Sequence, residues 1–381
     1  MPTTEQVFLA LLRATLNETV ALPMTADAPL YELASKHDLA HVVADALNKA
    51  ASLGEGDTAK AFKKAQYLAV YRYEQSRFSL EELSACLTEA QIPFLPLKGA
   101  VLRDHYPAPW MRTSCDLDIL VHEEDLDRAV KALTETLGYQ YEGKGAYDVS
   151  LVAPGEQHVE LHYGISSENH AVGAAKILAN VWAYARADDG CRFVLPDAVF
   201  YLYHIAHMAK HLENGGCGVR PFMDLWILQH RVDGDKQARD ALLETAGLTA
   251  FEREATALAE HWFSEAPPTE TSRLLEALIL RGGIYGTLDT WAAMQQGRRG
   301  QGFGYWWRVI FPPFKELKQS YLFLPKWPIA YPFCLVHRLF DKLFGKKRKQ
   351  SSERLRQAVS VDKKEQQAMA ELLHRLNLKE Y

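Results

Sequence analysis

The 381-residue sequence predicts an α+β fold, in which a small mixed sheet with helices is flanked by N-terminal and C-terminal helical regions. Apolar residues recur at helical spacing through residues 1–91 and again through 166–310. Between these ranges, residues 92–165 alternate short apolar runs of strand length with one amphipathic helix. Residues 311–381 differ from the rest, and we expect an aromatic and proline-rich strap followed by basic C-terminal helices. These four ranges are the expected domains.

The N-terminal region, residues 1–91, is expected to be a helical bundle. Val7, Leu11, Leu12 and Leu16 have helical spacing, and residues 41–51 and 61–87 continue the pattern. No residue type in this region forms a pattern with recognisable chemistry. We therefore expect the bundle to pack behind a sheet or to form one wall of a cleft.

The stretch Asp116-Leu117-Asp118, followed by an apolar run to Val121, is the most informative part of the chain. In a strand, residues i and i+2 point to the same face, so Asp116 and Asp118 project side by side. Leu117, Ile119 and Val121 then occupy the opposite face. Two carboxylates held this close repel each other, and a divalent cation with oxygen ligands is the usual partner, most often Mg²⁺.

Two neighbouring segments strengthen this interpretation. Residues 92–100 form an apolar run that ends in Lys98-Gly99, and residues 158–162 alternate with period two. In the second segment Glu160 and His162 share a face. If this strand pairs next to the first, Glu160 becomes a third carboxylate beside Asp116 and Asp118. Three such acids can hold two metal ions about 4 Å apart, an arrangement that catalyses phosphoryl transfer. We expect Mg²⁺, with Mn²⁺ as an alternative.

The rest of residues 92–165 completes an α+β module. Residues 122–137 form the best-defined helix, because Leu126, Val130, Leu133 and Leu137 make an apolar stripe and Gly138 follows as a stop. Short strands are expected at 139–142, 149–152 and 158–162.

Residues 92–165 resemble the uncharacterised nucleotidyltransferase family of the DNA polymerase beta superfamily. The resemblance rests on Leu97-Lys98-Gly99, Tyr106-Pro107, Arg112, Asp116 to Val121 and Glu160-Leu161-His162, and it extends more loosely through His204, His207 and Asp224. It implies a polymerase-beta-like fold in which Asp116, Asp118 and Glu160 are the catalytic metal ligands. It also implies transfer of a nucleoside monophosphate from a nucleoside triphosphate to an acceptor hydroxyl.

One departure from the superfamily concerns the phosphate-binding turn, which usually reads Gly-Ser and here reads Lys98-Gly99. Gly99 lets the backbone approach a phosphate, and a helix from Ala100 towards Tyr106 would offer its N-terminal amides. Lys98 would supply positive charge. Arg112 has two open interpretations, as a ligand of the triphosphate or as a partner of the acidic cluster. We expect Lys98, Gly99 and Arg112 to bind the nucleotide.

Residues 198–212 place His204, His207 and His211 on one helical face. The face is interpreted as a polar cleft lining, and a second metal site is the alternative because histidines one turn apart can ligate zinc. The resemblance favours a pocket wall. Beyond them, Asp224 is expected to orient a histidine, to pair with Arg220 or to begin a helix. Besides the triphosphate ligands, the predicted pocket-lining residues are His162, His204, His207, Arg220 and Asp224.

The stretch 302–349 interleaves aromatic residues with prolines and ends in a basic cluster from Arg338 to Lys349. Three interpretations stay open, which are a strap packed on the core, a peripheral membrane contact, and a nucleic-acid contact. The net charge of −5 at pH 7 makes nucleic acid the least favoured partner.

Composition is that of an ordinary globular protein, with 48% hydrophobic and 24% charged residues. The five cysteines are scattered without a CxxC pair, which argues against a zinc ribbon or a disulfide framework. The first residues lack the basic start of a secretory signal, and no apolar run has the length of a membrane span. We therefore expect a cytoplasmic protein, with peripheral membrane contact as an option.

Three function classes follow from these features. The first is a metal-dependent nucleotidyltransferase that uses a nucleoside triphosphate and an unknown acceptor. The second is a glycosyltransferase of the Asp-x-Asp type, in which an acid pair holds a metal against a nucleotide diphosphate. The third is a non-catalytic binding module of the same fold. The acceptor is not identified by the sequence, and sugars, lipid-linked glycans, antibiotics, RNA ends and protein side chains stay open.

Overall fold

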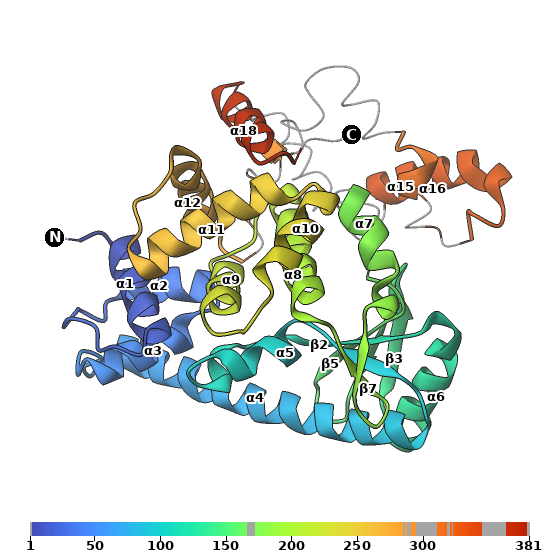
Figure 1. The fold of residues 1–381 in the computed structure, drawn as a ribbon, viewed down its shortest axis with the longest axis horizontal. Coiled ribbons are helices and arrows are strands. Elements are labelled where there is room, and N and C mark those ends of the chain that lie inside the picture. Colours follow the sequence, from blue (N-terminus) through green and yellow to red (C-terminus); the bar gives the residue numbers. More distant parts are fainter. Residues whose placement is uncertain are drawn as a thin grey trace.

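The fold, taken from a computed structural model, combines one seven-stranded mixed sheet with helices packed around it (Figure 1). The structure describes residues 2–165, 172–284, 286–287, 290, 292–294, 311–317, 321, 323–344 and 363–378. Within the aromatic and basic stretch 302–349, residues 302–310, 318–320, 322 and 345–349 lie outside the described residues. The predicted α+β class is confirmed.

The N-terminal region is helical, as expected, and its helices are α1 (Thr4–Leu16), α2 (Ala28–Lys36), α3 (Ala40–Lys49) and α4 (Asp57–Glu89). A capping box between Thr3 and Gln6 begins α1, and the Asp27 side chain caps α2. The 33-residue α4 runs along the lower edge of the view (Figure 1). It packs on α3 near its start and on α6 (Leu126–Thr136) near its end, so it links the bundle to the sheet.

The sheet has the strand order β3-β4-β5-β2-β1-β7-β6. Its strands are β1 (Phe94–Pro96), β2 (Asp116–Val121), β3 (Gln140–Lys144), β4 (Asp148–Val152), β5 (His158–His162), β6 (Arg186–Asp189) and β7 (Arg192–Val194). The pairs β2–β5 and β1–β7 are parallel, and the other neighbours are antiparallel. The four strands from 116 to 162 match the sequence prediction within two residues, and β1 lies inside the apolar run predicted at 92–100. By contrast, β6 and β7 extend the sheet from a range expected to be mostly helical.

The two faces of β2 separate the core from the polar side of the sheet. Leu117, Ile119 and Val121 are buried against Leu126 and Leu133 of α6. Period-two alternation places Asp116 and Asp118 on the other face, which confirms the facing predicted from the sequence. The 3-10 turns η1 (Arg103–His105), η2 (Pro109–Met111), η3 (Glu123–Asp125), η4 (Val181–Ala183) and η5 (Pro328–Ala330) complete the connections.

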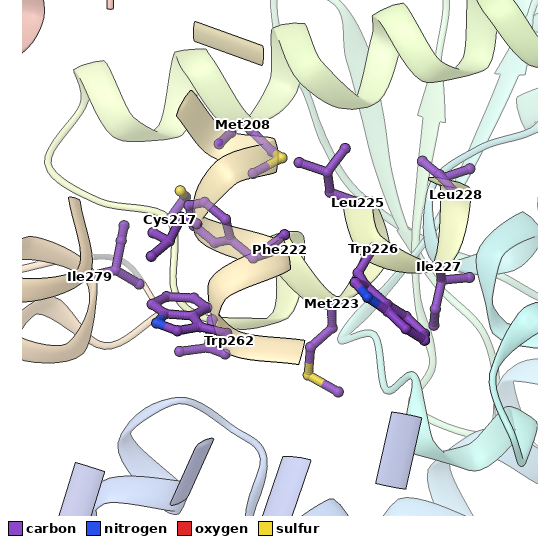
Figure 2. Packing of buried hydrophobic residues seen from close by; sticks show 14 of the residues in the cluster. Met208, Cys217, Phe222, Met223, Leu225, Trp226, Ile227, Leu228, Trp262 and Ile279 are labelled. Carbon is purple, nitrogen blue, oxygen red and sulfur yellow. The ribbon is translucent and has the colours of Figure 1, made fainter. Parts of the chain in front are cut away.

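A helical layer covers the polar face of the sheet (Figure 1). Its helices are α7 (Val172–Ala179), α8 (Asp197–Glu213), α9 (Arg220–His230), α10 (Lys236–Ala246), α11 (Thr249–Ser264) and α12 (Glu270–Gly282). Phe222 of α9 and Trp262 of α11 stack edge to face, with ring centroids 5.1 Å apart, and Met208 of α8 packs in the same cluster (Figure 2). This apolar packing fixes α8 and α9, whose polar residues face the sheet.

The C-terminal part contains α15 (Phe314–Leu317), α16 (Tyr331–Phe344) and α18 (Lys363–Arg375). In Figure 1, α15 and α16 lie at the periphery of the molecule, and α18 lies apart from them beside α12. None of the helices among the described residues combines the length and apolar character needed to cross a bilayer.

Candidate functional site

The acidic residues predicted from the sequence converge on the central parallel pair of strands. In the register of β2 and β5, Asp116 lies opposite His158, Asp118 opposite Glu160 and Leu120 opposite His162. Ligand atoms of Asp118, Glu160 and His162 all lie within 4.8 Å of one another, and this is the one such potential metal-binding group within the described part of the chain. The expected pairing of the two strands is therefore confirmed, and His162 joins the cluster from the same strand as Glu160.

Asp118 accepts two charged hydrogen bonds on a single oxygen atom. Lys98 Nζ lies 2.6 Å and His162 Nε2 lies 2.9 Å from Asp118 Oδ1, and His162 Nε2 is also 3.3 Å from Glu160 Oε2. Burial opposes ionisation of Asp118, but Lys98 and His162 outweigh it and hold the pKa of this carboxyl below its usual value. Asp118 is thus a buried anion whose charge two neighbouring cations compensate.

The same contacts change the pKa values of the two cationic groups. Burial disfavours the Lys98 ammonium, but the carboxylates of Asp118 and Glu160 outweigh burial and raise the pKa of Lys98. Burial also disfavours the His162 imidazolium, whereas hydrogen bonds to Asp118 and Glu160 raise the pKa of His162. Both groups therefore favour the charged state next to the acids.

Asp116 lies at the edge of this cluster and is not among its mutually close ligand atoms. Burial, followed by the charges of Glu160 and Asp118, raises the pKa of Asp116. Its carboxylate is thus repelled by the other acids. Asp118, by contrast, is in direct contact with both Lys98 and His162. Two of the three predicted metal ligands, Asp118 and Glu160, therefore lie together in the structure. The third member of this close group is His162, and Asp116 lies beside it.

Lys98 lies in a strained turn between β1 and α5 (Gly99–Leu102). Its φ is 47° and its ψ is −119°, and the Ala100 amide donates to the Leu97 carbonyl at 3.1 Å. These values are those of the first central position of a type II′ turn, which glycine normally occupies. Strained backbone at a non-glycine residue occurs mostly at functional sites. The turn projects the Lys98 side chain onto Asp118.

The short helix α5 differs from the predicted phosphate-binding helix. It spans four residues, and the amides of Ala100, Val101 and Leu102 donate to the carbonyls of Leu97 and Lys98. The helical stretch continues through η1 to His105, so it covers the range predicted from Ala100 towards Tyr106, but these three amides donate to backbone carbonyls of the turn itself. A Cβ atom at Gly99 would lie 3.4 Å from the Arg112 and Ser114 side chains, which places this turn in direct contact with the segment that leads into β2.

Arg112 forms a buried ion pair with Asp224 of α9. Arg112 Nε lies 2.8 Å from Asp224 Oδ1, and the Tyr106 hydroxyl donates to the same oxygen at 2.7 Å. Burial opposes ionisation of Asp224, but Arg112 outweighs it and lowers the pKa of Asp224. Arg220 instead forms an ion pair with Asp38. The suggested pair between Asp224 and Arg220 is therefore wrong, and both arginines join separate elements at the site.

A cleft of about 370 Å³ lies between the sheet and helices α8 and α9, a volume in the range of small-molecule sites. Its walls include Lys98, Arg112, Asp116, Asp118, Glu160, His204, His207, His211, Arg220 and Asp224. The chain thus brings most of the predicted site residues to one cavity. Gly99 and His162 lie directly beside it through their contacts with Arg112 and Asp118.

The histidines of α8 form the wall opposite the acids. His204 Nε2 donates to the Pro221 carbonyl at 3.0 Å, and the Nε2 atoms of His207 and His211 are 3.0 Å apart, so one of these two donates to the other. Burial lowers the pKa of both His204 and His207, and nearby Lys98 lowers that of His207 further. His204 and His207 therefore favour the neutral state, and all three histidines are hydrogen-bonded and line the cleft.

Sequence reasoning missed two aromatic residues of the same wall, Phe200 and Tyr203. Both follow the helical spacing that identified His204, His207 and His211, so the spacing alone could have found them. Burial raises the pKa of Tyr203, which keeps its hydroxyl protonated in the cleft.

Comparison with known proteins gives one match to this chain. No curated protein and no solved structure matches it. A family model described as "Uncharacterised nucleotidyltransferase" matches residues 25–264, which include the sheet, the acidic cluster and helices α8 and α9. Because this match covers more than half of the chain, the protein belongs to the uncharacterised nucleotidyltransferase family.

Proposed function

We propose that the chain transfers a nucleoside monophosphate from a nucleoside triphosphate to an acceptor hydroxyl, in a metal-dependent reaction that releases pyrophosphate. The observation that carries this proposal is the convergence of Asp118, Glu160 and His162 next to Lys98 in a family of nucleotidyltransferases. A polymerase-beta-like arrangement of the sheet is part of the same proposal.

The donor set fits a divalent cation. Two carboxylates and one imidazole lie close together, and Asp116 adds a further carboxylate at the rim. Oxygen ligands suit Mg²⁺, whereas an imidazole among them suits Mn²⁺ as well. Asp118 and Glu160, with Asp116 or His162, would hold the ion. When bound, such an ion supplies Lewis-acid activation of a hydroxyl and neutralisation of the leaving phosphates.

The remaining residues of the cleft have roles that their positions support. Lys98 and Arg112 provide positive charge for the triphosphate, and Gly99 keeps the turn that presents Lys98 close to them. The acceptor oxygen attacks the α-phosphorus, the bond from that phosphorus to the β-phosphate oxygen breaks, and Glu160 takes the hydroxyl proton. His204, His207, Arg220 and Asp224 form the wall on which the acceptor or the nucleoside would rest.

The two other function classes have less support. A glycosyltransferase of the Asp-x-Asp type needs a longer parallel nucleotide-binding unit before the acid pair, and here only β1 precedes β2, antiparallel to it. No observation favours that class. A non-catalytic module would not need the cluster of buried charges around Asp118. Metal and nucleotide binding decide between it and an enzyme.

The proposal is tested by incubating the protein with each of the four α-³²P-labelled ribonucleoside triphosphates, Mg²⁺ or Mn²⁺, and cell extract as a source of acceptor. We expect label to move to a product and pyrophosphate to appear with at least one triphosphate. Asp118→Asn should abolish both signals, and Asp57→Asn, whose side chain is fully exposed, should leave them unchanged. Equal turnover by Asp118→Asn and the unmodified protein would refute the assignment.

A further inference from the structure

Exposed large apolar side chains are concentrated in one C-terminal stretch, residues 323–340, far in sequence from the acidic cluster. The stretch contains six large side chains that are roughly half or more exposed, Phe323 (48%), Trp327 (66%), Ile329 (82%), Phe333 (75%), Val336 (67%) and Phe340 (64%). We refer to these six residues as the aromatic patch. Exposed apolar side chains that gather on one surface mark an interaction site in soluble proteins.

The aromatic patch is held outward by a small core of its own. Leu317, Leu324 and Cys334 are buried together on the inner side of α16. The Tyr331 hydroxyl donates to the Pro312 carbonyl at 2.7 Å, which ties α16 to the segment before α15. The inner apolar residues of this segment are therefore already packed, and the six residues of the patch are a second, outer set.

The helical part of the patch follows a single face. Phe333, Val336 and Phe340 are spaced at i, i+3 and i+7 on α16, so they project together. Trp327 and Ile329 lie in and just before η5, which leads directly into α16 and packs on it. An amphipathic helix with aromatic residues at its start has the arrangement of segments that lie in the plane of a membrane interface.

Charge distinguishes this segment from the rest of the molecule. Residues 323–349 carry seven lysine or arginine residues and one aspartate, a net charge of +6, in a chain whose net charge is −5. Lys326 and Arg338 lie within the described part, beside Trp327 and on α16 respectively. A polybasic segment next to exposed aromatic residues is attracted to anionic lipid headgroups at about 1 kcal/mol for each cation near the surface.

We propose that the aromatic patch docks on an anionic lipid surface, with Trp327, Ile329 and Phe333 inserted between headgroups and with Lys326 and Arg338 paired with lipid phosphates. A second copy of the chain is a poorer occupant, because two segments of charge +6 would repel each other. A nucleic acid is also a poorer occupant, because Ile329 and Val336 offer no ring on which a base stacks. The inference is independent of the proposed catalytic activity.

The test is co-sedimentation of the full-length protein with two kinds of vesicle, phosphatidylcholine alone and equal parts of phosphatidylcholine and phosphatidylserine. We expect binding to the anionic vesicles, weaker binding to the neutral ones, and weakening by added salt. The double variant Trp327→Ser/Phe333→Ser should reduce the partition coefficient roughly 100-fold, since each inserted aromatic side chain contributes about tenfold or more.

A matched control is the double variant Tyr71→Ser/Phe78→Ser. It removes two aromatic side chains of α4 that are each 57% exposed, and it should bind vesicles like the unmodified protein. Far-UV circular dichroism should be the same for all three proteins, because none of the changed residues is buried.

Three outcomes would overturn the proposal. The first is the absence of binding to anionic vesicles. The second is equal loss of binding in both double variants. The third is a Trp327→Ser/Phe333→Ser variant that still binds vesicles but no longer dimerises in sedimentation velocity or no longer retains a labelled RNA. None of these readouts uses transferase activity, so failure here leaves the proposed function untouched, and failure of the transferase assay leaves this test valid.

Discussion

The strained turn at Lys98 leads to a prediction about two substitutions at the same position. Lys98 has φ of 47° and ψ of −119°, a conformation in which glycine is the preferred residue. Both Lys98→Ala and Lys98→Gly remove the hydrogen bond to Asp118, so that loss cancels when the two variants are compared with each other. The difference between them isolates the backbone strain caused by a Cβ atom at this position.

The magnitude follows from two opposing contributions. A non-glycine residue in this region of φ and ψ is strained by about 1–3 kcal/mol. Glycine also increases the conformational entropy of the unfolded chain, which opposes its benefit by about 0.5–1 kcal/mol. We therefore expect Lys98→Gly to have a free energy of unfolding about 1 kcal/mol higher than that of Lys98→Ala.

Urea unfolding followed by circular dichroism measures this difference as a shift of the midpoint at constant slope. The control is the same pair of substitutions at Lys131, an exposed position inside α6 with ordinary helical backbone. There the sign should reverse, with glycine about 1 kcal/mol less stable than alanine. A Lys98→Ala variant as stable as Lys98→Gly, or more stable, would refute the claim of a strained turn. If the ammonium binds the triphosphate, both Lys98 variants should lose turnover equally.

Three further predictions concern the framework of the cleft. Asp224→Ala should destabilise the protein by about 3–5 kcal/mol, because Arg112 stays buried without its carboxylate, and calorimetry should show it as a lower melting temperature. Burial lowers the pKa of His37 and of His41 to about 4. Between pH 6.5 and pH 4 these two histidines are therefore protonated in the unfolded chain but neutral in the folded chain. The contribution of these two histidines to stability should be level above pH 6.5 and should fall by up to about 3 kcal/mol per histidine as the pH approaches 4. The fall should be shallower for His37→Gln, and a urea midpoint that stays flat between pH 6.5 and pH 4 would contradict the reasoning. Gly173→Ala should lower the urea midpoint even though alanine favours helices, because a Cβ atom there overlaps the backbone of α10.

The parts of the fold that the sequence predicts correctly are those with strong local periodicity. The alternation around Asp118 and Glu160 fixes which face each strand buries, and a one-residue error would place acids in the core. Strands β6 and β7 have no such pattern. The four residues of β6 are all exposed and include Asp188 and Asp189, so only the pairing of β7 with β1 makes this hairpin part of the sheet.

The contacts that sequence reasoning could not identify are tertiary. Arg112 and Asp224 are separated by 112 positions, and nothing local in either segment specifies their pairing. The same holds for Arg220 and Asp38, which connect α9 to the N-terminal bundle. Such pairs depend on how α9 is oriented, and the apolar packing of Phe222 against Trp262 sets that orientation. The spacing of charged residues along the chain carries no information about it.

The sequence and the structure point to different residues as the third metal ligand. Sequence spacing assigns Asp116, which lies two residues from Asp118, whereas the structure groups His162 with Asp118 and Glu160. If the structural grouping is right, His162→Gln should weaken Mn²⁺ binding by about 10-fold to 100-fold in isothermal titration calorimetry, as loss of a ligand or of its immediate hydrogen-bond partner does.

Asp116→Asn should then weaken Mn²⁺ binding by less. It should also stabilise the protein treated with a chelator, because burial and the neighbouring acids raise the pKa of Asp116 and its charge is unfavourable there. The opposite ranking, in which Asp116→Asn weakens Mn²⁺ binding strongly and His162→Gln hardly changes it, would support Asp116, Asp118 and Glu160 as the ligands, as predicted from the sequence. In that case His162 orients Asp118 through their 2.9 Å contact and does not bind the ion itself.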